Sequence, residues 1–89
     1  MMLEKYLTVQ NTLGIHARPA ALFSKTASRF QADIRVYKDG LEVNGKSIMG
    51  IMMLAAAKDN TIRVVAEGED EEKAIEALEK IINDRFGEE

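Results

Sequence analysis

The sequence of 89 residues has no cysteine, one proline and one histidine. The lack of cysteine excludes a disulfide scaffold and any metal or redox site built on thiolates. A single histidine without cysteine also leaves a transition-metal site short of ligands. We therefore expect no cofactor and no metal, and a small domain held together by packing alone.

Long apolar runs are missing as well. The sequence lacks the stretch of about 18 apolar residues that a membrane span needs. Residues 1–10 include Glu4 and Lys5 and do not resemble a signal peptide. We therefore expect a cytoplasmic protein in which residues 1–89 form a single domain.

The net charge of −3 is unevenly distributed along the chain. Residues 1–50 contain seven basic and four acidic residues, whereas residues 51–89 contain five basic and eleven acidic ones. The basic half includes the only histidine, His16, so it suits an acidic partner or an anion. We expect no nucleic-acid partner.

Hydrophobic patterns predict the order β-α-β-β-α-β-α. Alternating residues indicate strands at 3–9, 34–37, 41–43 and 61–66, and Asp39-Gly40 is typical of a hairpin turn. Helical spacing indicates a helix that starts near Pro19 and a last helix that Glu69 or Asp70 caps. Their core-facing residues are Ala20, Phe23, Ala27 and Phe30 in the first, and Ile75, Leu78, Ile82 and Phe86 in the last. The order predicts an α+β fold with helices on one face of an antiparallel sheet.

Residues 47–55 are predicted to form a short helix that Ser47 caps. Its core-facing side contains Ile48, Ile51, Leu54 and Ala55. We expect at least one of Met49, Met52 and Met53 to fill the core, and Met49 and Met52 to point largely outward. Flexible thioethers suit a surface that binds several partners.

The candidate chemistry lies in residues 12–19, where His16 is predicted at or next to the N-cap of the first helix. Backbone N–H groups of Ala17 and Arg18 lack helical partners there, and the helix dipole favours an anion. The Arg18 guanidinium can bind phosphate oxygens. The same positive surroundings favour a neutral, nucleophilic imidazole. From these residues alone, an ordinary helix start remains an alternative, whereas a Ser-His-Asp hydrolase would need a pocket that so short a chain hardly builds.

Two motifs bring in a family resemblance. Residues 14–20 have the sequence GIHARPA, and residues 44–52 have the sequence NGKSIMGIM. They resemble the active-site signature and the regulatory-serine signature of HPr, the histidine-containing phosphocarrier of the bacterial phosphoenolpyruvate-dependent sugar phosphotransferase system. The resemblance covers essentially the whole chain.

The resemblance implies a phosphocarrier rather than an independent enzyme. His16 matches the histidine phosphorylated on Nδ1, Arg18 matches the arginine that assists transfer, and Ser47 matches the serine modified by HPr kinase/phosphorylase. The family fold is an open-faced β-sandwich, a four-stranded antiparallel sheet covered on one face by three helices. The implied donor is phospho-Enzyme I, and the implied acceptors are Enzyme IIA domains. We expect these partners to dock on a monomer, at Thr12, Ile48, Met49 and Met52.

Other functions stay open at this point. A regulatory adaptor would act mainly through phosphorylated Ser47 and bind a transcription regulator or an enzyme. A carrier of a nitrogen-related phosphorelay would use the same histidine. A generic small-molecule binding module would leave the paired motifs unexplained.

Overall fold

The computed structural model describes residues 2–88. They form β1 (Met2–Thr8), α1 (Ala17–Ala27), β2 (Asp33–Lys38), β3 (Leu41–Asn44), α2 (Ile48–Met53), β4 (Thr61–Glu67) and α3 (Glu71–Asn83), followed by a tight turn, Arg85–Gly87. The predicted order of strands and helices is confirmed. No helix within residues 2–88 combines the length and the apolar character that crossing a membrane requires.

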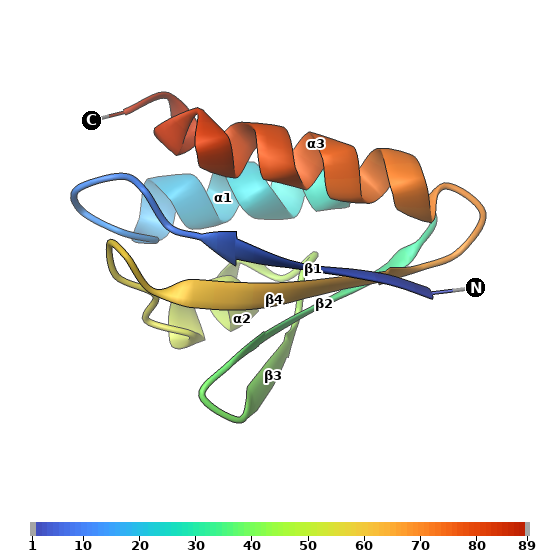
Figure 1. Ribbon diagram of the computed structural model, residues 1–89, viewed down its shortest axis with the longest axis horizontal. Helices are drawn as coiled ribbons and strands as arrows, with labels where there is room; N and C mark the ends of the chain where they lie inside the picture. The colour runs from blue at the N-terminus through green and yellow to red at the C-terminus, as the bar shows by residue number, and fades with distance from the viewer. Residues whose placement is uncertain (1, 89) are drawn as a thin grey trace.

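The four strands of residues 2–88 form one antiparallel sheet with the order β1-β4-β2-β3. Val64 of the central strand β4 lies opposite Lys5 of β1 and Val36 of β2, and Val36 lies opposite Val43 of β3. Helices α1 and α3 run side by side over one face of the sheet, and α2 packs next to α1 (Figure 1). The predicted open-faced sandwich is therefore confirmed.

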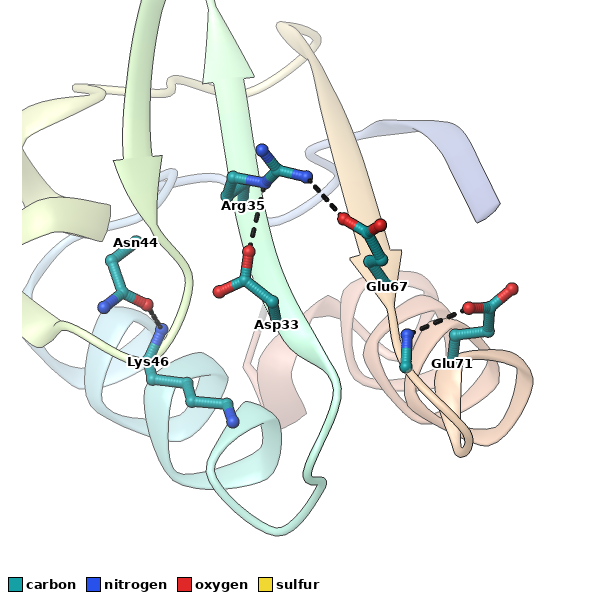
Figure 2. A network of polar contacts seen from close by, with 7 residues as sticks. Asp33, Arg35, Asn44, Lys46, Glu67 and Glu71 are labelled. Carbon is teal, nitrogen blue, oxygen red and sulfur yellow. Dashed lines mark hydrogen bonds and ion pairs between the residues drawn. The ribbon is translucent and has the colours of Figure 1, made fainter. Parts of the chain in front are cut away.

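Alternation along the strands separates the core from the open face of the sheet. Strand side chains that point to the helices are buried, among them Leu7, Ile34, Val36, Ile62 and Val64. They pack against the apolar stripes of α1 and α3, which include Phe23, Leu78 and Ile82. The opposite face carries ion pairs: Arg35 of β2 lies 3.2 Å from Asp33 and 3.3 Å from Glu67 of β4 (Figure 2). The open face therefore carries charged side chains that pair between neighbouring strands.

Helix α2 differs from its prediction. It ends at Met53, and Ala55 follows in a left-handed conformation (φ 50°) with an exposed side chain. Ile48 was predicted to face the core, but it is 46% exposed. Side chains of a helix lean toward its N-terminus, so the first residue of this short helix projects beyond the elements that cover Ile51 and Leu54.

Two aromatic residues reach the core from turns rather than from the helices predicted to hold them. Phe30 lies after the end of α1 at Ala27 and is half-buried. Phe86 is only 4% exposed, but it follows α3 and has a left-handed backbone (φ 54°). The spacing of apolar residues correctly predicted that these two side chains reach the core, but it did not predict where α1 and α3 end.

Candidate functional site

The loop between β1 and α1 is fixed at Gly14 and Ile15. Gly14 has a φ of +70°, and a Cβ atom on it would lie 2.6 Å from the carbonyl oxygen of Ala56, so only glycine fits. The next N–H, of Ile15, donates to that same carbonyl at 2.8 Å, and the Ile15 side chain is buried. The backbone directly before His16 is therefore held against the segment that follows α2.

His16 is the N-cap residue of α1, as predicted. Its backbone is extended (φ −93°, ψ −166°), its side chain makes no capping hydrogen bond, and that side chain is 39% exposed. Within residues 2–88, the backbone N–H groups of Ala17 and Arg18 also have no hydrogen-bond partner. An imidazole and two free donors thus share the positive end of a helix dipole.

The helix itself contributes only positive charge at this end. The first turn of α1 contains no acidic residue, and the exposed Arg18 forms no ion pair within residues 2–88. An exposed guanidinium on the same helix turn as unpaired N–H groups is suited to binding phosphate oxygens. The structure thus brings His16, Ala17 and Arg18 together at one exposed helix end.

Two further residues belong to the site and were missed in the sequence. Glu88 Oε1 lies 2.9 Å from Nε2 of His16 and 2.8 Å from Nδ2 of Asn11. Hydrogen bonds from His16 and from Asn11 lower the pKa of the Glu88 carboxyl below its ordinary value, although partial burial acts in the opposite direction. No local pattern signals this contact, because Glu88 and His16 are 72 positions apart in the chain.

The Glu88 carboxylate also changes the electrostatic argument made from the sequence. A carboxylate 2.9 Å from Nε2 adds negative charge to surroundings that Arg18 and the helix dipole make positive. Nδ1 of the same ring makes no hydrogen bond within residues 2–88. The ring therefore has one nitrogen in contact with an acid and the other available.

The predicted regulatory serine begins α2. Ser47 is the N-cap residue, and its Oγ accepts a hydrogen bond from the N–H of Gly50 at 3.0 Å. Ser47 lies near the middle of α1, because Ser24 of that helix donates to the carbonyl of the neighbouring Lys46 at 2.6 Å. The predicted cap is confirmed.

The predicted docking residues are all exposed. Thr12 lies in the loop before His16, and on α2 the exposed fractions are 46% for Ile48, 72% for Met49 and 40% for Met52. The expectation that at least one methionine of α2 fills the core is wrong, because Met53 is also 63% exposed. Ile51 and Leu54 already occupy the space beneath this short helix, so the methionines form an apolar surface.

A family model described as "PTS HPr component phosphorylation site" matches residues 3–84. The chain belongs to the HPr family. This match spans both motifs, so the resemblance that residues 14–20 and 44–52 carry is confirmed. Several curated relatives of this chain carry the name phosphocarrier protein HPr.

Individual HPr relatives agree over nearly the full chain. The chain is 49% identical to the phosphocarrier protein HPr of Xylella fastidiosa over 87 residues, 98% of each protein. A crystal structure of HPr-C-His from Thermoanaerobacter tengcongensis has a TM-score of 0.93 at 52% identity and covers 98% of both chains. The HPr fold is thereby confirmed.

The HPr family also includes a different kind of relative. A crystal structure of Crh, a Bacillus subtilis catabolite repression protein, has a TM-score of 0.75 at 44% identity, and the match covers 88% of this chain and 90% of Crh. That structure is a dimer with a swapping domain. For the present chain, the expected monomer stays a prediction.

Proposed function

We propose that this chain is a cytoplasmic phosphocarrier that accepts a phosphoryl group on Nδ1 of His16 from phospho-Enzyme I and passes it to Enzyme IIA domains. The observation that carries the proposal is the position of His16. Its half-exposed ring stands at an uncapped helix start, next in the chain to Ala17 and Arg18, whose N–H groups have no partner within residues 2–88 and of which Arg18 has an exposed side chain. A phosphoryl group on this ring meets donors on one side and remains within reach of a second protein.

The expected strength of these contacts suits a carrier. A charge at an exposed helix end gains about 0.3–1 kcal/mol from the dipole. Such modest stabilisation allows the phosphoryl group to leave again, so the transfer stays reversible. The partner proteins then supply most of the rate enhancement, and the chain acts as substrate and product rather than as an independent enzyme.

The exposed apolar side chains of α2 supply the proposed docking surface. Ile48, Met49 and Met52 point outward from α2, and Thr12 lies in the loop that presents His16. Polarizable, flexible methionines adapt to more than one partner surface. We assign donor and acceptors to this same surface, because both must reach one histidine.

Phosphorylation of Ser47 by HPr kinase/phosphorylase is the proposed control. Ser24, which contacts the residue before Ser47, lies eight positions after His16, so the two sites are separated by about 12 Å along α1. This exceeds the Debye length of about 8 Å at physiological ionic strength. Phosphoserine therefore acts by repelling an acidic Enzyme I at the docking surface, and only weakly on the His16 ring itself.

The second candidate is a regulatory adaptor that acts mainly through phosphorylated Ser47 and binds a transcription regulator. The similarity to Crh favours it. The carrier remains the main proposal, because an adaptor does not need His16 and Arg18 together at a free helix start.

The test is incubation of the purified chain with Enzyme I and phosphoenolpyruvate, followed by mass measurement. We expect one added phosphoryl group that is labile in acid and stable in base, and that is absent from His16→Ala. A variant without His16 that still becomes labelled would overturn the proposal. Transfer from the labelled chain to an Enzyme IIA domain separates the carrier from the adaptor.

A further inference from the structure

Residues 84–88 reverse the chain after α3 in an unusual backbone conformation. Three consecutive residues are left-handed: Arg85 (φ 56°), Phe86 (φ 54°) and Gly87 (φ 75°). Left-handed backbone is unfavourable for residues that carry a Cβ atom, so this turn needs support from elsewhere. The Phe86 side chain gives that support, because it is 4% exposed within the core. The end of α3 and the loop before α1 lie at the same end of the molecule (Figure 1), and the turn brings Glu88 to Asn11 of that loop.

The Glu88 carboxylate is fixed between two side chains. Nδ2 of Asn11 donates to Glu88 Oε1 at 2.8 Å and to the Gly14 carbonyl at 2.6 Å, and Asn11 is fully buried. The same Oε1 atom lies 2.9 Å from Nε2 of His16. Asn11 therefore joins the loop that presents His16 to the acid that contacts its ring.

We propose that Glu88 is a positioning residue that keeps the His16 hydrogen on Nε2, so that Nδ1 presents its lone pair, and that Asn11 holds Glu88 in place. This inference rests on the proposed function of His16. An ionised carboxylate only accepts hydrogen bonds, so the neutral ring must donate from Nε2. In a neutral imidazole the other nitrogen then carries the lone pair, and it is the nucleophile.

The same contact acts during the transfer. The Nδ1 lone pair forms the new bond to phosphorus, while the bond between phosphorus and its donor atom breaks and its electron pair leaves with the donor. The ring loses no proton, because Nε2 keeps its hydrogen. The positive charge that the ring gains lies next to the Glu88 carboxylate, as for a histidine paired with an acid in hydrolases. The onward step reverses these changes, so Glu88 assists both directions.

The test separates ring position from transfer. In the free chain with ¹⁵N-labelled histidine, at alkaline pH, ring ¹⁵N shifts report which nitrogen carries hydrogen. We expect hydrogen on Nε2 in the wild type, a mixture of both forms in Glu88→Ala, and the wild-type form again in Glu88→Gln, whose amide oxygen still accepts. Phosphoryl transfer should slow by roughly tenfold in Glu88→Ala and by less in Glu88→Gln.

The control is Glu72→Gln, which changes an exposed acid of α3 that forms no ion pair within residues 2–88 and should alter neither readout. Unchanged ring shifts in Glu88→Ala would overturn the positioning role, whatever happens to the rate. If His16→Ala still became phosphorylated, the proposed function of His16 would itself be wrong. The Glu88→Gln variant, which keeps a similar shape, shows whether a slow Glu88→Ala merely unfolds.

Discussion

Helices α1 and α2 both begin at a residue that we propose is phosphorylated, but they use their backbone donors in opposite ways. The His16 side chain makes no capping bond, and the N–H groups of Ala17 and Arg18 have no partner within residues 2–88. The Ser47 hydroxyl, in contrast, accepts a bond from the N–H of Gly50. The N-terminus of α1 thus has backbone donors available to an anion before any modification, and we call it the open start. At the N-terminus of α2, the closed start, the Ser47 side chain already occupies a backbone donor.

The N-terminus of α3 has acidic residues that the first turns of α1 and α2 lack. Helix α3 has Glu71 and Glu72 in its first turn, which compensate its dipole, whereas the first turns of α1 and α2 contain no acidic residue. A phosphate at α3 would meet negative charge. The two proposed sites of phosphorylation are thus at the two helix starts whose own first turns add no negative charge, although at α1 the Glu88 carboxylate from the other end of the chain contacts His16.

The largest expected effect concerns Gly14, which shapes the loop before the N-terminus of α1. Gly14→Ala should lower the free energy of unfolding by about 2–5 kcal/mol, because it adds a strained left-handed alanine to a close contact with Ala56. Urea unfolding measures this. Gly40→Ala is the matched control: its φ is +84°, but nothing lies within 4 Å of the added atom, so it should cost only about 1–2 kcal/mol. Equal losses would contradict the role of the close contact.

The next effect concerns the charge at the open start. Arg18→Ala should slow phosphorylation of His16 by about 10- to 100-fold, because a hydrogen bond to a charged group contributes about 1.5–3 kcal/mol. Arg29→Ala, which removes an exposed arginine after the other end of α1, is the control and should leave the rate within about twofold. Quench-flow measurement with phospho-Enzyme I gives both rates. If the two variants slowed by similar factors, Arg18 would act only through the net charge of the protein.

The closed start borders the docking surface. Met49→Glu should weaken binding of donor and acceptor alike by about tenfold, because it puts a charge into an apolar contact. Met2→Glu changes another exposed methionine, on β1, and should have no such effect. Titration calorimetry with Enzyme I and with an Enzyme IIA domain measures both. Binding that stays unchanged in Met49→Glu would move the docking surface away from α2.

Local sequence patterns predicted most of this fold, because strand alternation and helix stripes depend on neighbouring residues. The Asp39-Gly40 turn and the Ser47 cap depend on two to four residues and were predicted correctly. The misplaced Ile48 and Met53 show the limit: which side of a short helix is covered depends on the elements around it.

The residues of the site likewise divide into those that a local pattern predicts and those that only the fold brings together. His16, Ala17 and Arg18 are neighbours in the chain, so a helix start predicted them together. Asn11 and Glu88 meet only through the left-handed turn after α3, and they are 77 positions apart. The sequence contained nothing that connects the acid after this turn to His16.

A smaller effect separates the two roles of Ser47. Ser47→Ala removes the cap and should lower the free energy of unfolding by about 1 kcal/mol. Ser47→Asp keeps a good capping group, so its stability should stay near the wild type while phosphorylation of His16 by Enzyme I slows. Thermal unfolding and the transfer rate are compared for the three proteins. Equal transfer rates for Ser47→Asp and the wild type would refute the regulatory role.

The smallest expected effect is a pH dependence of stability that arises from Asp70 at the N-terminus of α3. Asp70 is the N-cap residue of α3, but its carboxylate accepts from the N–H groups of Gln31 and Ala32 at 2.9 and 2.8 Å instead of capping its own helix. The bond from Gln31 does most to lower the pKa of Asp70 below its ordinary 3.8; burial acts in the opposite direction, and the bond from Ala32 lowers the pKa further.

Because that pKa is lower in the folded state, the ionised carboxylate stabilises the fold above the ordinary value, and this contribution is lost as the pH falls through the folded-state pKa. Asp70→Asn should therefore be less stable than the wild type at neutral pH, with a difference that shrinks below about pH 4. Glu42→Gln, an exposed acid on β3 that forms no ion pair within residues 2–88, should show a smaller change with pH. A difference for Asp70→Asn that stays constant down to pH 2 would mean that Asp70 anchors the loop through its shape and not through its charge.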